Sequence, residues 1–133
     1  MVKYRRGGRK RPKEGFTLIE LLVVLAILAL LLTIAVPRYF HSLEAAREGV
    51  LRENLHVTRE ALDKFKADVG RYPDTLEELV SRRYLRALPI DPITESSATW
   101  ELVAPEDGSK GSIADLHSGA TGQARDGRLF REW

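Results

Sequence analysis

The hydrophobic positions of this 133-residue chain change their spacing along its length. An unbroken apolar run, FTLIELLVVLAILALLLTIAV, occupies residues 16–36 and includes one charged side chain, Glu20. Because a helix rises about 1.5 Å per residue, such a run spans about 30 Å, which matches the hydrocarbon core of a bilayer. The run therefore predicts a membrane-spanning helix.

After this run, residues 37–69 predict an amphipathic helix. Apolar and small side chains recur at steps of three and four, the spacing of one helix face: Leu43, Ala46, Val50, Leu51, Leu55, Thr58, Leu62, Phe65 and Val69. The opposite face carries charges: Glu44, Arg47, Glu48, Arg52, Glu53, Arg59, Glu60, Asp63 and Lys66. Many of these charges have an opposite charge three or four residues away, so we expect the charged face to be solvated.

Residues 70–133 predict a small head. Gly70 suits the position that follows a helix end, and Thr75 with Glu78 has the spacing of a capping box, so a short helix is expected over 75–83. Residues 84–92 contain two prolines and predict a loop. We expect three apolar side chains of this loop to pack inward: Leu85, Leu88 and Ile90.

Two later segments, 99–103 and 113–117, alternate between apolar and polar residues and predict short antiparallel strands, and 128–133 is a candidate third strand. The sheet is expected to pack on the long helix through Trp100, Leu102, Leu116 and Phe130. The predicted fold is therefore α+β. It consists of a long N-terminal helix, half transmembrane and half amphipathic, packed on a small antiparallel sheet.

Charge is distributed unevenly along the chain. Residues 1–15 carry seven basic side chains against one acidic one, whereas residues 16–133 carry 14 basic and 18 acidic side chains. By the positive-inside rule, the basic end stays in the cytoplasm and the residues after Arg38 lie across the membrane. The acidic excess of the remainder disfavours binding to nucleic acid.

Composition excludes several kinds of site. The chain has no cysteine, which excludes a disulfide framework, a thiolate zinc site and a lipid-modified cysteine. Its three histidines, His41, His56 and His117, do not have metal-ligand spacing, and no phosphate-binding loop or catalytic triad is visible. We expect no catalytic activity.

Glu20 needs an explanation, because a carboxylate within an apolar membrane segment is costly and usually functional. An unprocessed membrane anchor accounts for the length of residues 16–36 but gives Glu20 no role. An ordinary secretory signal has a shorter apolar core and a small-x-small cleavage site, of which Thr33-Ile34-Ala35 is a poor version.

The segment G-F-T-L-I-E at 15–20 lies between a basic leader and the apolar run, with Pro37 after it. This combination resembles the signal of type IV pilins and type II secretion pseudopilins. The resemblance implies that a prepilin peptidase cleaves after Gly15, that the leader 1–15 is removed, and that the new N-terminus at Phe16 is methylated. It also implies that Glu20 pairs with the N-terminus of a neighbouring subunit. Pro37 either marks the end of the membrane helix or, as the resemblance implies, lies in a continuous helix that kinks there or melts locally during assembly.

A second match lies in the head, where G-R-Y-P-D-T-L-E-E-L-V at 70–80 and Y-L-R-A-L-P-I-D-P at 84–92 resemble the major pseudopilin of type II secretion. The implied fold is type IV pilin-like, and the implied role is a structural subunit of a pseudopilus that supports protein export. The implied location is the bacterial inner membrane, crossed once, with a periplasmic head. The implied partners are prepilin peptidase, other pseudopilins as homopolymer and minor subunits, the inner-membrane assembly platform and membrane lipid.

Two alternatives remain open. One is a minor pilin of a type IV pilus or of a DNA-uptake pseudopilus. The other is a membrane-anchored periplasmic binding protein that does not polymerise.

The resemblance also implies calcium as a possible cofactor in the loop 118–127. Calcium prefers six to eight oxygen ligands, several of them charged, and Asp126 is the one carboxylate in this loop. Arg125 next to Asp126 favours an ion pair between the two residues instead. Asp126 is thus a weak calcium candidate, and no other metal ligand is expected.

Overall fold

The computed structural model describes residues 2–4, 7–8 and 12–133. Five of the seven basic leader residues lie outside these ranges: Arg5, Arg6, Arg9, Lys10 and Arg11.

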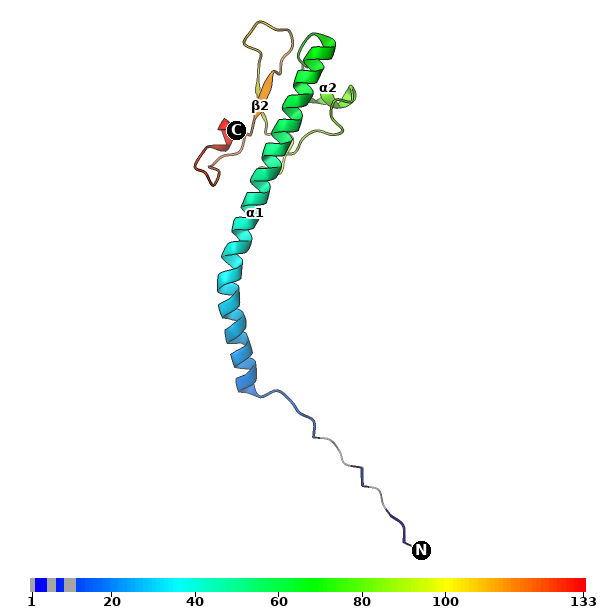
Figure 1. Cartoon of the computed structure of the whole chain (residues 1–133), viewed down its shortest axis with the longest axis vertical. Helices are drawn as coiled ribbons and strands as arrows, with labels where there is room; N and C mark the ends of the chain where they lie inside the picture. The colour runs from blue at the N-terminus through cyan, green and yellow to red at the C-terminus, as the bar shows by residue number, and fades with distance from the viewer. Residues whose placement is uncertain (1, 5–6, 9–11) are drawn as a thin grey trace. The chain divides into compact units, whose positions relative to one another are not determined.

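The described residues form five elements in the order α1 (Leu18–Val69), α2 (Leu76–Ser81), β1 (Glu101–Val103), β2 (Asp115–His117) and the 3-10 helix η1 (Phe130–Glu132) (Figure 1). Strands β1 and β2 pair antiparallel, with Leu102 opposite Leu116. The predicted α+β fold, a long N-terminal helix with a small antiparallel sheet, is confirmed.

The chain divides into two compact units, Met1–Tyr39 and Phe40–Trp133. In the first unit, the large apolar side chains of α1 are exposed from Leu18 to Val36. Among the described residues, α1 is the one helix long and apolar enough to cross a membrane, and its most apolar stretch is not buried. Pro37 lies inside α1, which continues without interruption on both sides of it. The kink expected at Pro37 stays a prediction.

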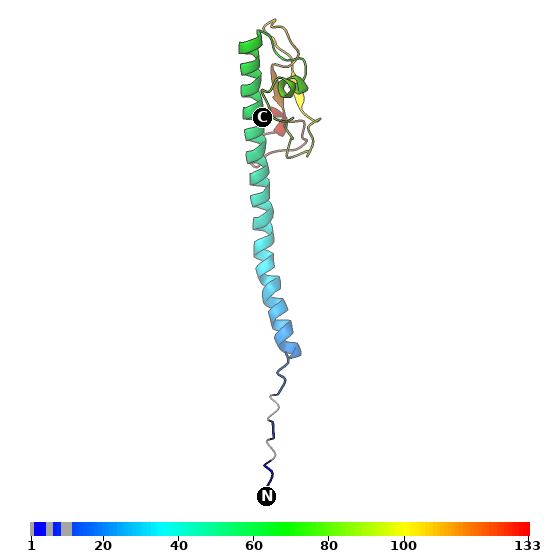
Figure 2. The ribbon, with the colours of Figure 1, turned by 90° about the vertical axis from the view of Figure 1, so that its right-hand side faces the viewer.

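The second unit has its core between the later part of α1 and the segments that follow it. Both views show β2 and the end of the chain beside this part of the helix (Figures 1 and 2). The predicted apolar stripe is largely confirmed, because Leu51, Leu55, Leu62 and Phe65 are all buried. The Tyr84 ring packs edge-on against Phe65 at 5.3 Å between centroids. Burial of each large apolar side chain contributes roughly 1.5 to 3 kcal/mol.

Four residues expected on the apolar face or in the core are exposed: Ala46, Val50 (50%), Ile90 (57%) and Leu102 (50%). Val50 lies about 100° around the helix from Leu51, which places it beyond the edge of the buried stripe. Among the described residues the sheet has two strands, so β1, which carries Leu102, is an edge strand. The loop turns Leu85 and Leu88 toward the core and leaves Ile90 outside.

The third strand was also a wrong prediction, because residues 130–132 form η1. The backbone N–H of Glu132 donates to the carbonyl of Leu129, and the backbone N–H of Trp133 donates to the carbonyl of Phe130. These hydrogen bonds are local and do not pair the segment with a strand. The rings of Phe130 and Trp133 then pack edge-on at 5.7 Å, and both are buried. Phe130 reaches the core as expected, but from a helical turn.

Helix α2 is shorter than expected. Thr75 caps it, since its hydroxyl accepts the backbone N–H of Glu78 at 3.3 Å. The second half of the predicted capping box is absent among the described contacts, because the Glu78 carboxylate binds the Arg71 guanidinium and the Asp74 backbone N–H instead. Two residues beyond the helix, Arg83 adopts a positive φ of 64°, a conformation that an α-helix cannot continue.

Candidate functional site

The segment before α1 exposes the predicted cleavage site. Residues 12–17 have no regular secondary structure, and the Phe16 side chain is 93% exposed. A Cβ atom added at Gly15 would meet no other atom within 4 Å. The bond between Gly15 and Phe16 is therefore open to a peptidase.

Glu20 lies at the first turn of α1 and caps it. The Thr17 backbone N–H donates to Glu20 Oε2 at 3.0 Å, and the Glu20 backbone N–H donates to Thr17 Oγ1 at 3.2 Å. This reciprocal pair is a capping box, which satisfies two N–H groups at a helix start. The role of Thr17 was not among the predictions, although the spacing Thr17-x-x-Glu20 has the same capping-box form as Thr75-x-x-Glu78.

The structure brings the predicted processing and assembly residues together. A hollow of about 420 Å³ is lined by Glu14, Gly15, Phe16 and Glu20. Glu20 Oε1 makes no hydrogen bond or ion pair with the described residues, so this oxygen is free to accept a cation while Oε2 caps the helix. Pro37 and Asp126 lie elsewhere and do not contribute to this hollow.

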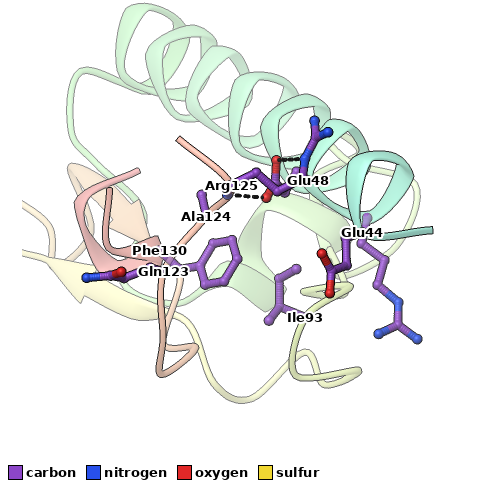
Figure 3. Close-up of a pocket in the computed structure, with 8 residues that line it drawn as sticks. Glu44, Glu48, Ile93, Gln123, Ala124, Arg125 and Phe130 are labelled. Carbon is purple, nitrogen blue, oxygen red and sulfur yellow. Dashed lines mark hydrogen bonds and ion pairs between the residues drawn. The ribbon is translucent and has the colours of Figure 1, made fainter. Parts of the chain in front are cut away.

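A second polar site lies in the unit Phe40–Trp133. A pocket of about 310 Å³ lies between α1 and the later loops of this unit. It is lined by Glu44, Arg47, Glu48, Ile93, Gln123, Ala124, Arg125 and Phe130. Figure 3 shows Arg125 reaching from its loop to Glu48 on α1. The pocket therefore contains a direct link between the long helix and the loop 118–127.

Glu48 was expected on the solvated face of α1. This prediction was wrong, because Glu48 is buried, with 6% of its surface exposed. Its carboxylate accepts two hydrogen bonds from Arg125, one from the backbone N–H at 2.8 Å and one from Nε at 3.1 Å. The predicted pairing of Arg125 with Asp126 is also wrong. A buried carboxylate needs such partners, because removing a charge from water is costly unless it is paired.

The Asp126 carboxylate pairs with arginine side chains and is not surrounded by further metal ligands. Its carboxylate accepts hydrogen bonds from the Arg128 backbone N–H at 3.1 Å and from Arg128 Nε at 2.9 Å. These bonds to Arg128 hold the pKa of Asp126 below its ordinary value. Arg52 Nη2 lies 4.0 Å from the same carboxylate.

The residues of the loop therefore do not fit a calcium ion. Calcium requires several oxygen ligands around one point, whereas two guanidinium groups approach Asp126. Within residues 2–4, 7–8 and 12–133, no group of three or more His, Cys, Asp or Glu side chains is placed to hold a metal ion. The cations that hold this loop are arginine side chains.

Chelation gives a direct check of this point. Adding EGTA, or millimolar calcium, is expected to leave the thermal unfolding midpoint of the second unit unchanged. The Glu48–Arg125 and Asp126–Arg128 pairs need no ion to hold the loop. Near-ultraviolet circular dichroism of Trp100 and Trp133 would measure the midpoint, since both side chains are buried in this unit. A saturable rise of the midpoint with calcium would contradict the expectation, with magnesium as the control ion.

Comparisons with known proteins found matches to the N-terminal segment and to most of the length of the chain. A family profile described as a prokaryotic N-terminal methylation motif matches residues 10–36. A Pseudomonas aeruginosa protein named type II secretion system core protein G is 34% identical over 132 residues, covering 86% of this chain and 89% of that protein. Proteins of the same name from Vibrio cholerae and Klebsiella pneumoniae are each 32% identical. The match with the Vibrio cholerae protein covers 86% of this chain and 86% of that protein, and the match with the Klebsiella pneumoniae protein covers 91% and 94%. No solved structure matches significantly.

Proposed function

Because the chain belongs to the family of the type II secretion system core protein G, we propose that it is a structural subunit of a type II secretion pseudopilus, without catalytic activity of its own. The observation that carries the proposal is the exposed apolar surface of α1 from Leu18 to Val36, directly after an accessible Gly15–Phe16 bond. Such a surface is stable in a bilayer or against other copies of the same helix, and a filament subunit uses both environments in turn.

The proposed maturation proceeds in three steps. Prepilin peptidase cleaves after Gly15 on the cytoplasmic side, the leader 1–15 is lost, and the new ammonium group at Phe16 is methylated. The mature chain then spans the inner membrane through residues 16–36, with the helix 37–69 and the head 70–133 in the periplasm. The exposed, irregular backbone of residues 12–17 supports the cleavage step, because a protease binds its substrate in an extended form.

Assembly is proposed to use Glu20. The free Oε1 of Glu20 accepts the Phe16 ammonium of an adjacent copy, which compensates both charges in an apolar environment and sets the register between subunits. The partners of this step are other copies of the chain, minor pseudopilins and the inner-membrane assembly platform. The filament grows in the periplasm and supports protein export.

The N-terminal sequence and intact mass of the protein, purified from cells that contain prepilin peptidase, test the proposal. We expect a chain that begins at N-methylated Phe16. Gly15→Val is expected to block cleavage almost completely, because a branched side chain does not fit where a peptidase accommodates glycine. The fold tolerates this change, since a Cβ atom at Gly15 contacts nothing.

Gly8→Val is the matched control, because Gly8 is equally open and lies outside the proposed cleavage site. This variant is expected to be processed normally. An intact leader in the presence of active peptidase would contradict the proposal, and so would a chain that begins near Val36. The second outcome would indicate an ordinary signal peptide.

A further inference from the structure

One flank of α1 in the second unit exposes aliphatic side chains. Val50 is 50% exposed and Val57 is 42% exposed, and Glu53 lies between them on the same side of the helix. The Asn54 side-chain amide donates to the Ile90 carbonyl at 2.8 Å, so the backbone of Ile90, a residue that is 57% exposed, lies next to this stretch of α1. We call Val50, Glu53, Val57 and Ile90 the aliphatic flank.

The Glu53 side chain makes no hydrogen bond or ion pair with any residue in the described ranges. The aliphatic flank therefore combines three exposed β-branched side chains with an unpaired carboxylate. Apolar side chains grouped in this way indicate a surface that another molecule covers. The molecule that covers this one must supply a positive charge for Glu53.

The other flank of α1 has the complementary chemistry. A pocket of about 320 Å³ is lined there by Arg52, Leu55, His56, Arg59, Arg128, Glu132 and Trp133, which we call the arginine pocket. The Trp133 ring lies against two guanidinium groups, with Arg52 4.5 Å and Arg128 5.4 Å from its centroid. Trp133 Nε1 is buried and has no hydrogen-bond partner in the described part of the chain. This pocket offers cations and an unused donor.

The three arginines of the arginine pocket differ in how closely they pair with carboxylates. Arg59 lies 2.8 Å from an Asp115 oxygen, and Arg128 lies 2.8 Å from an Asp126 oxygen. Arg52 has its nearest carboxylate oxygen, that of Asp126, at 4.0 Å. Among these three arginines, Arg52 is the one whose guanidinium can best accept a further carboxylate.

The two surfaces cannot meet within one chain. Val50 and Arg52 are two residues apart, about 200° around the helix, so the surfaces point to opposite sides. Arg52 and Glu53 are adjacent and do not face each other. Two different surfaces that match each other form a heterologous contact, which builds an open filament when the rotation between copies does not close a ring.

We propose that the aliphatic flank of one copy docks on the arginine pocket of a second copy of this chain, with Glu53 paired to Arg52. This inference rests on the proposed function and names the surfaces that subunits use outside the membrane. The aliphatic side chains cover the apolar part of the pocket, Leu55 and the Trp133 ring, while Glu53 supplies a carboxylate to Arg52, whose nearest carboxylate oxygen within its own chain lies at 4.0 Å.

Cysteine cross-linking tests the contact in the full chain, which has no cysteine of its own. A Val50→Cys chain and a Glu132→Cys chain, distinguishable by a size tag, are expressed together in cells that contain the assembly system. Glu132 also lines the arginine pocket. We expect disulfide-linked mixed dimers and few dimers of either variant alone. Dimers of Val50→Cys with itself would overturn the proposal, because they indicate a contact between identical surfaces.

A charge exchange gives the second measurement. Glu53→Arg and Arg52→Glu are each expected to lower the mixed-dimer yield about fivefold, the upper range for an exposed ion pair. The double variant Glu53→Arg/Arg52→Glu is expected to recover most of the yield. Glu77→Arg, which makes the same change at an exposed site on α2, is the control and is expected to have no effect.

The outcomes separate this inference from the proposed function. Assembled filaments without mixed dimers, or with yields that the single charge variants do not change, would overturn the docking surfaces and leave the pseudopilin role intact. A chain that is never processed at Phe16 and never assembles would overturn both. Recovery by the double variant supports the inference independently of any loss of folding in the single variants.

Discussion

Replacing Glu20 by alanine is expected to abolish filament assembly and to leave cleavage before Phe16 intact. The change removes the carboxylate that would compensate the Phe16 ammonium of a neighbouring copy, so an unpaired charge would remain in an apolar contact. Loss of the cap costs about 1 kcal/mol in addition, too little to melt a helix of 52 residues. Electron microscopy of filaments released by opening the outer membrane, and the N-terminal sequence of the chain, would measure the two effects.

The capping box requires controls that separate its two functions. Glu20→Gln keeps an oxygen that can accept the Thr17 N–H but removes the charge, and it is expected to fail in assembly as the alanine variant does. Thr17→Ala removes the hydroxyl that accepts the Glu20 N–H and keeps the charge, so it is expected to assemble. The opposite pattern, assembly by Glu20→Gln and failure of Thr17→Ala, would show that capping matters and charge does not. Normal filaments with Glu20→Ala would contradict the role of the carboxylate in assembly. An absence of filaments from the unmodified chain, with function unaffected in Glu20→Ala, would favour the membrane-anchored binding protein that does not polymerise.

The helical parts of this fold could be predicted from the sequence because their signals are local. The spacing of Leu51, Leu55, Leu62 and Phe65 identifies the buried face of α1, and Thr75 identifies the start of α2. The Thr17–Glu20 capping box had the same kind of local signal. Such features depend on residues three or four positions apart, so they follow from helix geometry.

The loops could not be predicted as well, because their contacts join distant residues. Glu48 lies next to the buried stripe, and whether it is solvated depends on Arg125, 77 residues later in the chain. Likewise, Asn54 determines the place of Ile90, 36 residues away. Gly119 is held against Thr99, where an added Cβ atom would lie 1.8 Å from the Thr99 carbonyl oxygen. No periodicity in the sequence indicates which of these pairs will form.

Replacing Glu48 by alanine is expected to destabilise the unit Phe40–Trp133 by about 2 to 3 kcal/mol. The Arg125 backbone N–H loses its acceptor, and the guanidinium loses a partner whose side chain is 8% exposed. The loss is smaller than the 3 to 5 kcal/mol typical of a fully buried pair, because the Arg125 side chain is 40% exposed and can be hydrated. In a unit of this size, the unfolding midpoint should fall by roughly 10 °C or more. Near-ultraviolet circular dichroism of the full chain in detergent would follow it.

Glu44→Ala is the matched control, because Glu44 lies one turn earlier on α1, lines the same pocket and is exposed. It is expected to change the unfolding free energy by less than about 0.5 kcal/mol. In a double-mutant cycle, Glu48→Ala with Arg125→Ala should show a coupling of about 1 kcal/mol or more, since the residues are in direct contact. Equal midpoints for Glu48→Ala and Glu44→Ala would contradict the role of this pair. A coupling of that size would show that Arg125 positions the loop 118–127 against the long helix. In a calcium-binding loop, the metal ion would have this role.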